Sequence, residues 1–384
     1  MPTINSHQSE RAVPFDWHSK LCDIVLDREA GTLLHAQLRT SLRRLVEIAP
    51  DNAPKLPPES ELVKLLNVAP STVRKALDGL VTEGLIERRR ALGTVIKPRR
   101  PAESLKTLAV IMPNYPSHSI SAHIAALNRQ MGMLGGKMLI IPLNRGDDWK
   151  SCHAQLDFPA SDGGVLFFNN IPDATVIDLN SALRQQGYRT VHLGRPPEGC
   201  PCGSVCISAE ALVRVGVERL VAAGHRKITF LVGEPEENRD VRARVDAFEN
   251  ITASLGLPAS NVLHCGIHAW ESSSEAANMA IDTLWNRPVS ARPTAIFAIS
   301  DTTAIGAFMG LSRHGIRVPD DVSLLSSDGS ELTRMTSPPL DSLLIPVDKF
   351  AVAITGALSD RHAGNQKILI EPDYKEGKSI MKIN

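Results

Sequence analysis

The chain has 384 residues, of which 43% are hydrophobic and 22% are charged. That composition excludes a collagen-like, mucin-like or wholly disordered protein, and the length fits two or three globular domains. Basic and acidic residues are balanced at 42 each, yet residues 31–100 contain 13 basic and 7 acidic side chains. A compact basic segment joined to a mildly acidic remainder indicates a module that binds a polyanion.

Neither a membrane segment nor a leader peptide is expected from the sequence. No stretch approaches the roughly 18 apolar residues that span a bilayer. Residues 1–17 lack the basic and apolar regions of a signal peptide. We therefore expect a cytoplasmic protein without a membrane partner, in a compartment that keeps thiols reduced.

The first hundred residues change from an aperiodic tail to a regular pattern. Residues 1–28 are polar and are predicted to form a mobile tail. Leucines at three- and four-residue spacing predict a helix over residues 31–48. A proline pair opens a second helix over residues 59–66, and a third helix follows Pro70.

A basic hairpin completes this first domain. Two short strands flank a tight turn that contains Gly93. Three helices and a hairpin within residues 29–97 predict a winged helix-turn-helix domain. Residues 98–106 combine prolines with basic side chains and are predicted to be a stiff linker.

Apolar strands alternate with amphipathic helices over residues 107–384. This alternation is typical of βαβ units, so the class is α/β with mainly parallel sheets. The segment is long enough for two lobes of similar size, and the gap between residues 232 and 295 is expected to contain a further strand. The predicted strands cover residues 107–112, 137–142, 164–168, 190–193, 227–232, 295–298 and 322–326.

Five short motifs follow one another along the basic domain. They are LPPESEL at 56–62, LNV at 66–68, STVRKAL at 71–77, EGLI at 83–86 and GTV at 93–95. Their order and spacing over residues 31–97 resemble the GntR family of winged-helix transcription regulators. The resemblance implies binding to double-stranded operator DNA.

The helix that begins near Ser71 is expected to enter the major groove with its first residues closest to the bases. Hydroxyl and basic side chains of this helix, and backbone of the wing, suit contacts to phosphates and base edges. The candidate DNA contacts are Ser60, Ser71, Thr72, Arg74, Lys75, Arg89, Arg90, Gly93 and Thr94. The alternative for the arginines of the hairpin is a solvated charged face.

The domain departs from the family pattern at four positions. Ser60 and Pro70 stand where the family commonly has arginine, and Ala91 and Leu92 stand where the wing often has glycine and a basic residue. Those arginines usually supply much of the specific contact. The operator of this chain is therefore left open.

A second set of motifs covers the body. They are GVERLVAAGHRKI at 216–228, RVDAF at 244–248, PTAIFAISD at 293–301, GIRVPDDVS at 315–323 and PPL at 338–340. Residues 107–384 thus resemble the LacI/GalR regulators, whose effector domain has the fold of periplasmic sugar-binding proteins. The resemblance implies a homodimer and a small-molecule effector, most simply a sugar, bound between two lobes.

The resemblance also assigns roles to single residues. Arg244 matches the family's cleft arginine, which forks to effector hydroxyls or a carboxylate. Asp328 matches an aspartate that accepts hydrogen bonds from two sugar hydroxyls. Trp270 stands where an aromatic ring often stacks on the ligand, and Ser300 where a polar side chain contacts it. Asp301 is expected to cap the following helix.

Four side chains of the first lobe lie just after predicted strands, where ligands of open α/β sheets bind. They are Asn114, Tyr115, Asn169 and Arg195. Each candidate has a structural alternative: an ordinary surface arginine at Arg244, lobe packing at Trp270, a helix start at Ser300 and a structural cation at Asp328.

Two departures concern the pocket. Ser208 replaces a frequent aspartate, and Ser326 with Ser327 replaces the usual glycine and aromatic residue. They indicate an enlarged or more polar pocket, so the effector's identity is open.

The favoured function is a dimeric, effector-controlled transcription regulator, most simply a repressor. One alternative is a regulator whose body only dimerises. Another is an enzyme, but the G-x-S-x-G, P-loop, G-x-G-x-x-G and H-E-x-x-H motifs are missing. No cofactor is expected. Cys200, Cys202 and Cys206 are interpreted as buried or incidental thiols rather than a metal site.

Overall fold

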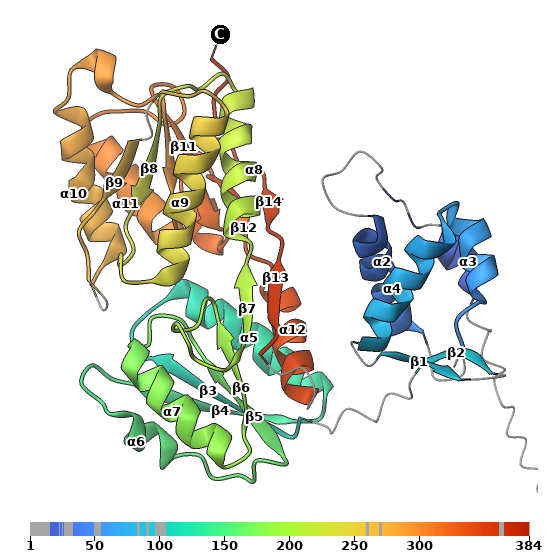
Figure 1. Ribbon diagram of the computed structural model, residues 1–384. Helices are drawn as coiled ribbons and strands as arrows, with labels where there is room; N and C mark the ends of the chain where they lie inside the picture. The colour runs from blue at the N-terminus through green and yellow to red at the C-terminus, as the bar shows by residue number, and fades with distance from the viewer. Residues whose placement is uncertain are drawn as a thin grey trace, which may run out of the picture. The chain divides into compact units, whose positions relative to one another are not determined.

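The computed structural model describes residues 16–22, 24, 26, 34–49, 55–82, 85–89, 92–96, 105–258, 261–268, 271–360 and 365–383. The chain forms two compact units, Met1–Pro101 and Ala102–Asn384, which are described separately below. Figure 1 shows their helices and strands.

The first unit is a winged helix-turn-helix, as predicted. Its elements are α1 (Trp17–Cys22), α2 (Leu34–Ile48), α3 (Glu59–Leu66), α4 (Pro70–Thr82), β1 (Ile86–Arg89) and β2 (Gly93–Ile96). Leu38 and Leu42 of α2 pack against Leu77 and Leu80 of α4, and all four side chains are fully buried. The amphipathic spacing that predicted these helices therefore produces one small apolar core.

Part of the predicted tail belongs to this core. Leu21 of α1 is fully buried, and Trp17 and Ile24 pack against the same cluster. The expectation of a mobile tail is therefore wrong for this short segment. The three apolar residues are spaced by four and three positions, as on one face of a helix, and the polar surroundings hid that signal. Residues 1–15 lie outside the described residues.

The wing is an antiparallel pair. Ile86 pairs with Ile96 and Arg89 with Gly93. Gly93 has φ of 83°, in the left-handed region that favours glycine. A hydrogen bond of 3.0 Å from the Leu56 N–H to the Thr94 carbonyl oxygen attaches the wing to the segment just before α3.

The second unit contains two six-stranded sheets. One has the order β4-β3-β5-β6-β7-β13 and the other β9-β8-β10-β11-β12-β14. All neighbours are parallel except β12 and β14. The strands of the first lobe are β3 (Thr107–Pro113), β4 (Lys137–Leu143), β5 (Gly163–Phe167), β6 (Arg189–Leu193), β7 (Gly203–Ile207) and β13 (Lys367–Ile370). Those of the second are β8 (Ile228–Val232), β9 (Asn261–His264), β10 (Ala295–Ala298), β11 (Ser323–Asp328), β12 (Asp341–Leu344) and β14 (Asp373–Lys375).

Helices cover both faces of each sheet (Figure 1). In the first lobe α5 (His118–Met133) and α12 (Val347–Ser359) pack together on one face, while α6 (Trp149–His153) and α7 (Asp173–Gln185) cover the other. In the second lobe α8 (Ala209–Ala222) and α9 (Arg239–Ser254) lie opposite α10 (Ser273–Trp285) and α11 (Asp301–Arg313). None of the helices described combines the length and apolar character that crossing a bilayer requires.

The predicted strands are confirmed as β3, β4, β5, β6, β8, β10 and β11. The gap after Val232 contains β9, as expected. Sequence reasoning missed β7, β12, β13 and β14, because each stands directly beside a connection between the lobes, where the regular βαβ alternation is interrupted. Leu105 is buried in the body, so the predicted linker ends before it, and residues 97–104 lie outside the described residues.

Three chain segments connect the lobes, around residues 208, 345 and 371. The Ser208 N–H donates to the Ile370 carbonyl oxygen at 2.8 Å, which ties the first segment to the third. The Ile345 N–H donates to the Asp328 carbonyl oxygen at 3.2 Å. The connections therefore position the end of β11, where one predicted site residue stands.

Candidate functional site

The candidate DNA-binding surface is the polar face of α4. Val73, Ala76 and Leu77 are fully buried, whereas Arg74 and Lys75 are exposed. Ser71 is exposed and Thr72 half-buried in the first turn, and Ser60 is exposed on α3. The buried residues anchor α4 in the apolar core, so its basic side chains point to solvent, where a polyanion could contact them.

The arginines of the hairpin differ in their partners. Arg88 bridges Glu59 at 3.1 Å and Asp78 at 2.9 Å, which ties β1 to α3 and α4. Arg74 is 64% exposed and lies only 3.7 Å from Glu59, a weak pair that leaves it available. Arg89 is exposed beside Glu87. Arg90 lies outside the described residues.

The candidate effector site stands where the parallel strands of the two lobes end. In the first lobe Tyr115 follows β3, Asn170 follows β5 and Arg195 follows β6. In the second lobe Glu234 follows β8 and Ser300 follows β10. Ligands of open α/β sheets bind outside the carboxyl ends of the strands, so the position fits a binding site.

Glu234 accepts two hydroxyl hydrogen bonds at the centre of this site. Ser300 Oγ donates to Glu234 Oε1 at 2.8 Å, and Ser273 Oγ donates to the same atom at 3.3 Å. Burial raises the pKa of Glu234, while these bonds and the charge of Arg244 oppose the rise. The preceding Gly233 is required because a Cβ there would lie 2.6 Å from Thr303 Oγ1.

Arg244 on α9 lies near Glu234, and its charge acts on that carboxyl group. Its Nη1 donates to the Ile299 carbonyl oxygen at 3.0 Å. Its Nε is buried and has no hydrogen-bond acceptor among the described residues. The guanidinium therefore keeps a donor free, which suits a fork-like contact to a ligand oxygen.

Asp328 ends β11 in an unusual backbone conformation. Its φ is 97°, which is strained for a non-glycine residue and is found mainly where function demands it. Burial, followed by the charge of Asp301, raises the pKa of Asp328 well above its usual range, and the charge of Arg244 opposes this.

The structure corrects the role expected for Asp301. Ser300 is the N-cap of α11, because its Oγ accepts from the Thr303 N–H at 3.3 Å. Asp301 instead accepts hydrogen bonds from Ser326 Oγ and Ser342 Oγ, at 2.5 and 3.1 Å, and from the Ser330 N–H. Ser326 therefore satisfies a buried carboxylate rather than enlarging the pocket.

Direct contacts join the lobes beside the site. Asp240 accepts from the Arg195 N–H at 3.0 Å and from Arg195 Nη1 at 2.8 Å. Asn238 in the second lobe donates to Asn170 Oδ1, and Asn170 Nδ2 donates to the Tyr115 hydroxyl at 2.9 Å. Arg195 and Tyr115 thus lie at the lobe-to-lobe boundary.

The remaining candidates are less central. Asn114 is exposed and donates to Asn144 Oδ1 at 2.8 Å, at the end of β4. Asn169 is half-buried beside Gly194, and Trp270 lies outside the described residues. Sequence reasoning missed Glu234, although the rule that selected the other residues, a polar residue directly after a strand, also applies to it.

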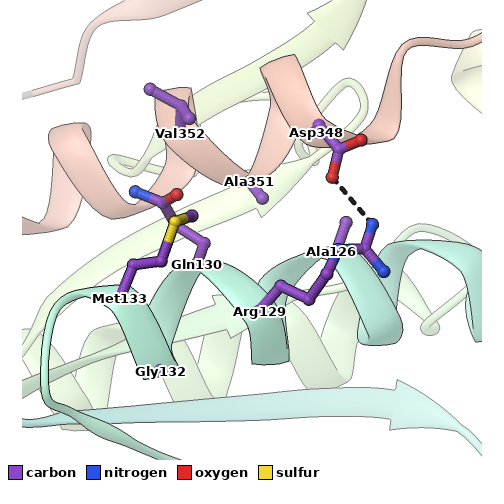
Figure 2. Close-up of a pocket in the computed structure, with 8 residues that line it drawn as sticks. All are labelled: Ala126, Arg129, Gln130, Gly132, Met133, Asp348, Ala351 and Val352. Atoms are coloured by element: carbon purple, nitrogen blue, oxygen red, sulfur yellow. Dashed lines mark hydrogen bonds and ion pairs between the residues drawn. The ribbon is translucent and has the colours of Figure 1, made fainter.

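A separate groove of about 540 Å³ lies between α5 and α12 (Figure 2). Met133 and Val352 line it, and its charged side chains, Arg129 and Asp348, pair at 2.8 Å. Because this charge pair is already satisfied, the groove offers few groups to orient a polar ligand. It lies on the first lobe and is distinct from the strand-end site.

Comparison with known proteins agrees with both parts. Residues 38–96 match the model of bacterial regulatory proteins of the gntR family, and residues 217–380 match a periplasmic binding protein-like domain. The chain therefore joins a GntR-type helix-turn-helix domain to a periplasmic binding protein-like body.

The chain is also similar to curated bacterial transcription regulators. The chain is 28% identical over 226 residues to the HTH-type transcriptional repressor PurR of Photobacterium profundum, covering 58% of this chain and 65% of the repressor. It is 25% identical over 292 residues to catabolite control protein A of Priestia megaterium, covering 75% and 83%. The fold resembles that of a LacI family regulator from Weissella paramesenteroides solved with bound sucrose, with a TM-score of 0.63 and 19% identity over 72% of this chain and all of that one.

Proposed function

We propose that this protein is a transcription regulator that binds operator DNA with its winged-helix unit and changes its DNA affinity when a small, hydroxyl-rich molecule binds between the lobes of its body. The observation that carries the proposal is the junction, in one chain, of an exposed basic recognition helix and a two-lobed body with a polar strand-end site. Such a target places the protein in the cytoplasm with the chromosome.

Repression by a homodimer is the favoured mode. The similar regulators include proteins named repressors, and two winged-helix units would bind the two halves of an inverted repeat. Effector binding then shifts operator affinity by its differential affinity for the two states, typically about 1–3 kcal/mol.

The arrangement of the site favours a sugar or a related polyol as the effector. Glu234 and Asp328 supply carboxyl oxygens that can accept hydrogen bonds from ligand hydroxyls, and Arg244 supplies a buried donor. Support also comes from the similar fold that holds sucrose. A body that only dimerises would have no need of a strained Asp328 and a partly unpaired Arg244 at one point.

The test is selection of binding sites from random duplex DNA by the purified full-length protein, with and without a panel of common sugars. Enrichment of an inverted repeat, released by one sugar, is the expected result. Enrichment that no sugar alters, together with no sugar binding in calorimetry, would support a body that only dimerises. Failure to enrich any sequence would overturn the proposal that the protein is a transcription regulator.

A further inference from the structure

One part of the body is not explained by the effector site: the loop that connects β6 to β7 and contains a C-x-C pair. The Sγ atoms of Cys200 and Cys202 lie 3.7 Å apart in hydrogen-bonding contact. Cys202 is 4% exposed, whereas Cys200 is half-buried. Cys200 is therefore the more exposed residue of the pair, and its sulfur contacts that of the buried Cys202.

The backbone holds the two thiols together. The Cys202 N–H donates to the Cys200 carbonyl oxygen at 2.9 Å, which closes a three-residue turn with Pro201 at its centre. Proline fixes its φ near the value that such a turn requires. Forming a disulfide needs the sulfurs to approach by only about 1.7 Å, to a bond length near 2.05 Å.

Side chains of α7 stabilise negative charge on Cys200. Asn180 is fully buried, its Oδ1 accepts from Thr190 Oγ1 at 2.6 Å, and its Nδ2 finds no acceptor within the described ranges by hydrogen-bond geometry. The hydrogen bond with Cys202 lowers the pKa of Cys200, burial opposes this effect, and the charge of Arg184 and the amide of Asn180 add smaller lowering contributions. The same thiol pair raises the pKa of Cys202, so Cys202 remains the protonated partner.

We propose that Cys200 and Cys202 form a redox-reactive dithiol, which a hydroperoxide converts into an intramolecular disulfide. The Cys200 thiolate attacks the peroxide, its O–O bond breaks, and Cys200 becomes a sulfenic acid while one water or alcohol leaves. Cys202 sulfur then attacks the sulfenic sulfur, the S–O bond breaks, and the hydroxyl leaves as water with the Cys202 proton. Two thiols are oxidised by two electrons, and one peroxide is reduced.

The test treats the reduced full-length protein with hydrogen peroxide, alkylates the remaining thiols and maps them by mass spectrometry. Trypsin releases residues 190–214 as one peptide that contains Cys200, Cys202 and Cys206. We expect this peptide to lose two alkylatable thiols and the mass of two hydrogen atoms, roughly tenfold faster than the exposed Cys22 is oxidised. Dithiothreitol should restore both thiols.

Variants separate the role of Cys200, which attacks the peroxide, from that of Cys202, which completes the disulfide. Cys206 is buried, and burial raises its pKa to about 11, so Cys206→Ser is the matched control and should oxidise like the wild type. Cys202→Ser should stop at a Cys200 sulfenic acid that dimedone traps, and Cys200→Ser should lose no thiol pair. Asn180→Asp keeps an oxygen for Thr190 but replaces the amide donor, and should slow the oxidation several-fold while thermal unfolding reports that the fold is kept.

Two results would overturn the dithiol. One is a wild-type peptide that stays reduced while Cys22 is oxidised. The other is a disulfide within this peptide that persists in Cys200→Ser, because it would have to join Cys202 to Cys206. Both readouts concern thiol chemistry alone, so neither depends on the proposed regulator function.

Discussion

The winged-helix unit and the body place their candidate binding residues in different ways. In the first, the candidate DNA contacts fall between Ser60 and Thr94 and include exposed basic side chains on one helix and its wing. In the second, side chains from strand ends between Tyr115 and Asp328 meet at one partly buried site. A surface for DNA needs charge that solvent can reach, whereas a small-molecule site needs enclosed polar groups.

This contrast predicts that the two activities can be lost separately. A variant of the body should change the effector response without changing operator affinity, and a variant of the winged helix should do the reverse. The predictions below test that separation in order of expected size.

The largest effect is expected from Arg244→Ala. Removing the guanidinium leaves Glu234 and Asp328 without their cationic neighbour and removes a donor to the ligand. We expect effector affinity to fall roughly 100-fold, as for the loss of a buried charged partner, with operator affinity within about twofold. Titration calorimetry and a mobility-shift assay measure the two affinities. Arg242→Ala, at an exposed position of the same helix, is the control; equal losses in both variants would contradict the assignment.

Arg74→Ala tests the other unit. Arg74 is exposed and only weakly paired, so its loss should not disturb the fold. Operator affinity should fall about tenfold and the salt dependence of binding should become shallower by about one ion, because one phosphate contact is removed. Lys64→Ala is the matched control, because it also removes one exposed positive charge, on α3, at a position that is not a candidate DNA contact. An unchanged salt dependence in Arg74→Ala would remove this residue from the DNA-binding surface.

Gly93→Val asks whether the wing depends on backbone conformation. Nothing lies within 4 Å of the added Cβ, so the cost comes from the positive φ alone. We expect the winged-helix unit to lose about 1–2 kcal/mol of unfolding free energy, with weaker operator binding and normal effector binding. Gly132→Ala on α5, also without neighbours but without a positive φ, should be neutral or slightly stabilising. Denaturant unfolding of both variants makes the comparison; equal stability would show that the wing tolerates a side chain there.

The smallest effect concerns pH. Because burial raises the pKa of Glu234, the folded state favours the protonated acid, and stability falls as pH rises through the raised pKa. Glu234→Gln cannot ionise, so it should melt about 2 °C above the wild type at pH 8, and this difference should shrink towards pH 5. Thermal unfolding across this range measures it, and a difference independent of pH would show that Glu234 does not titrate as described.

Much of the fold could be predicted from local patterns. The helices of the first unit follow from apolar spacing, and the regular βαβ strands follow from buried apolar runs such as residues 107–113. The segment around Leu21 escaped because a six-residue helix gives only two or three periodic positions. The edge strands β13 and β14 escaped because they have only four and three residues, too few to give a periodic signal.

The candidate site was only partly predictable for the same reason. Arg244, Ser300 and Asp328 were selected by motif position, and the structure brings Arg244 and Ser300 to Glu234. The sequence left open whether Ser300 contacts the ligand or only starts a helix; it caps α11 and also donates to Glu234. Asp301 accepts three hydrogen bonds instead of capping the helix, and this could not be foreseen because Ser326, Ser330 and Ser342 lie far from it along the chain.

By itself, the sequence determined the division into a basic winged helix and a two-lobed body. Apolar spacing and local charge can be recognised within short stretches of the chain, so they do not depend on tertiary contacts. Only the tertiary structure decided which polar groups meet, how Arg195 is held by Asp240, and that Cys200 and Cys202 share one contact. These arrangements depend on strand order and on burial, where a polar group without a partner costs about 1–3 kcal/mol and the chain must therefore supply one from elsewhere.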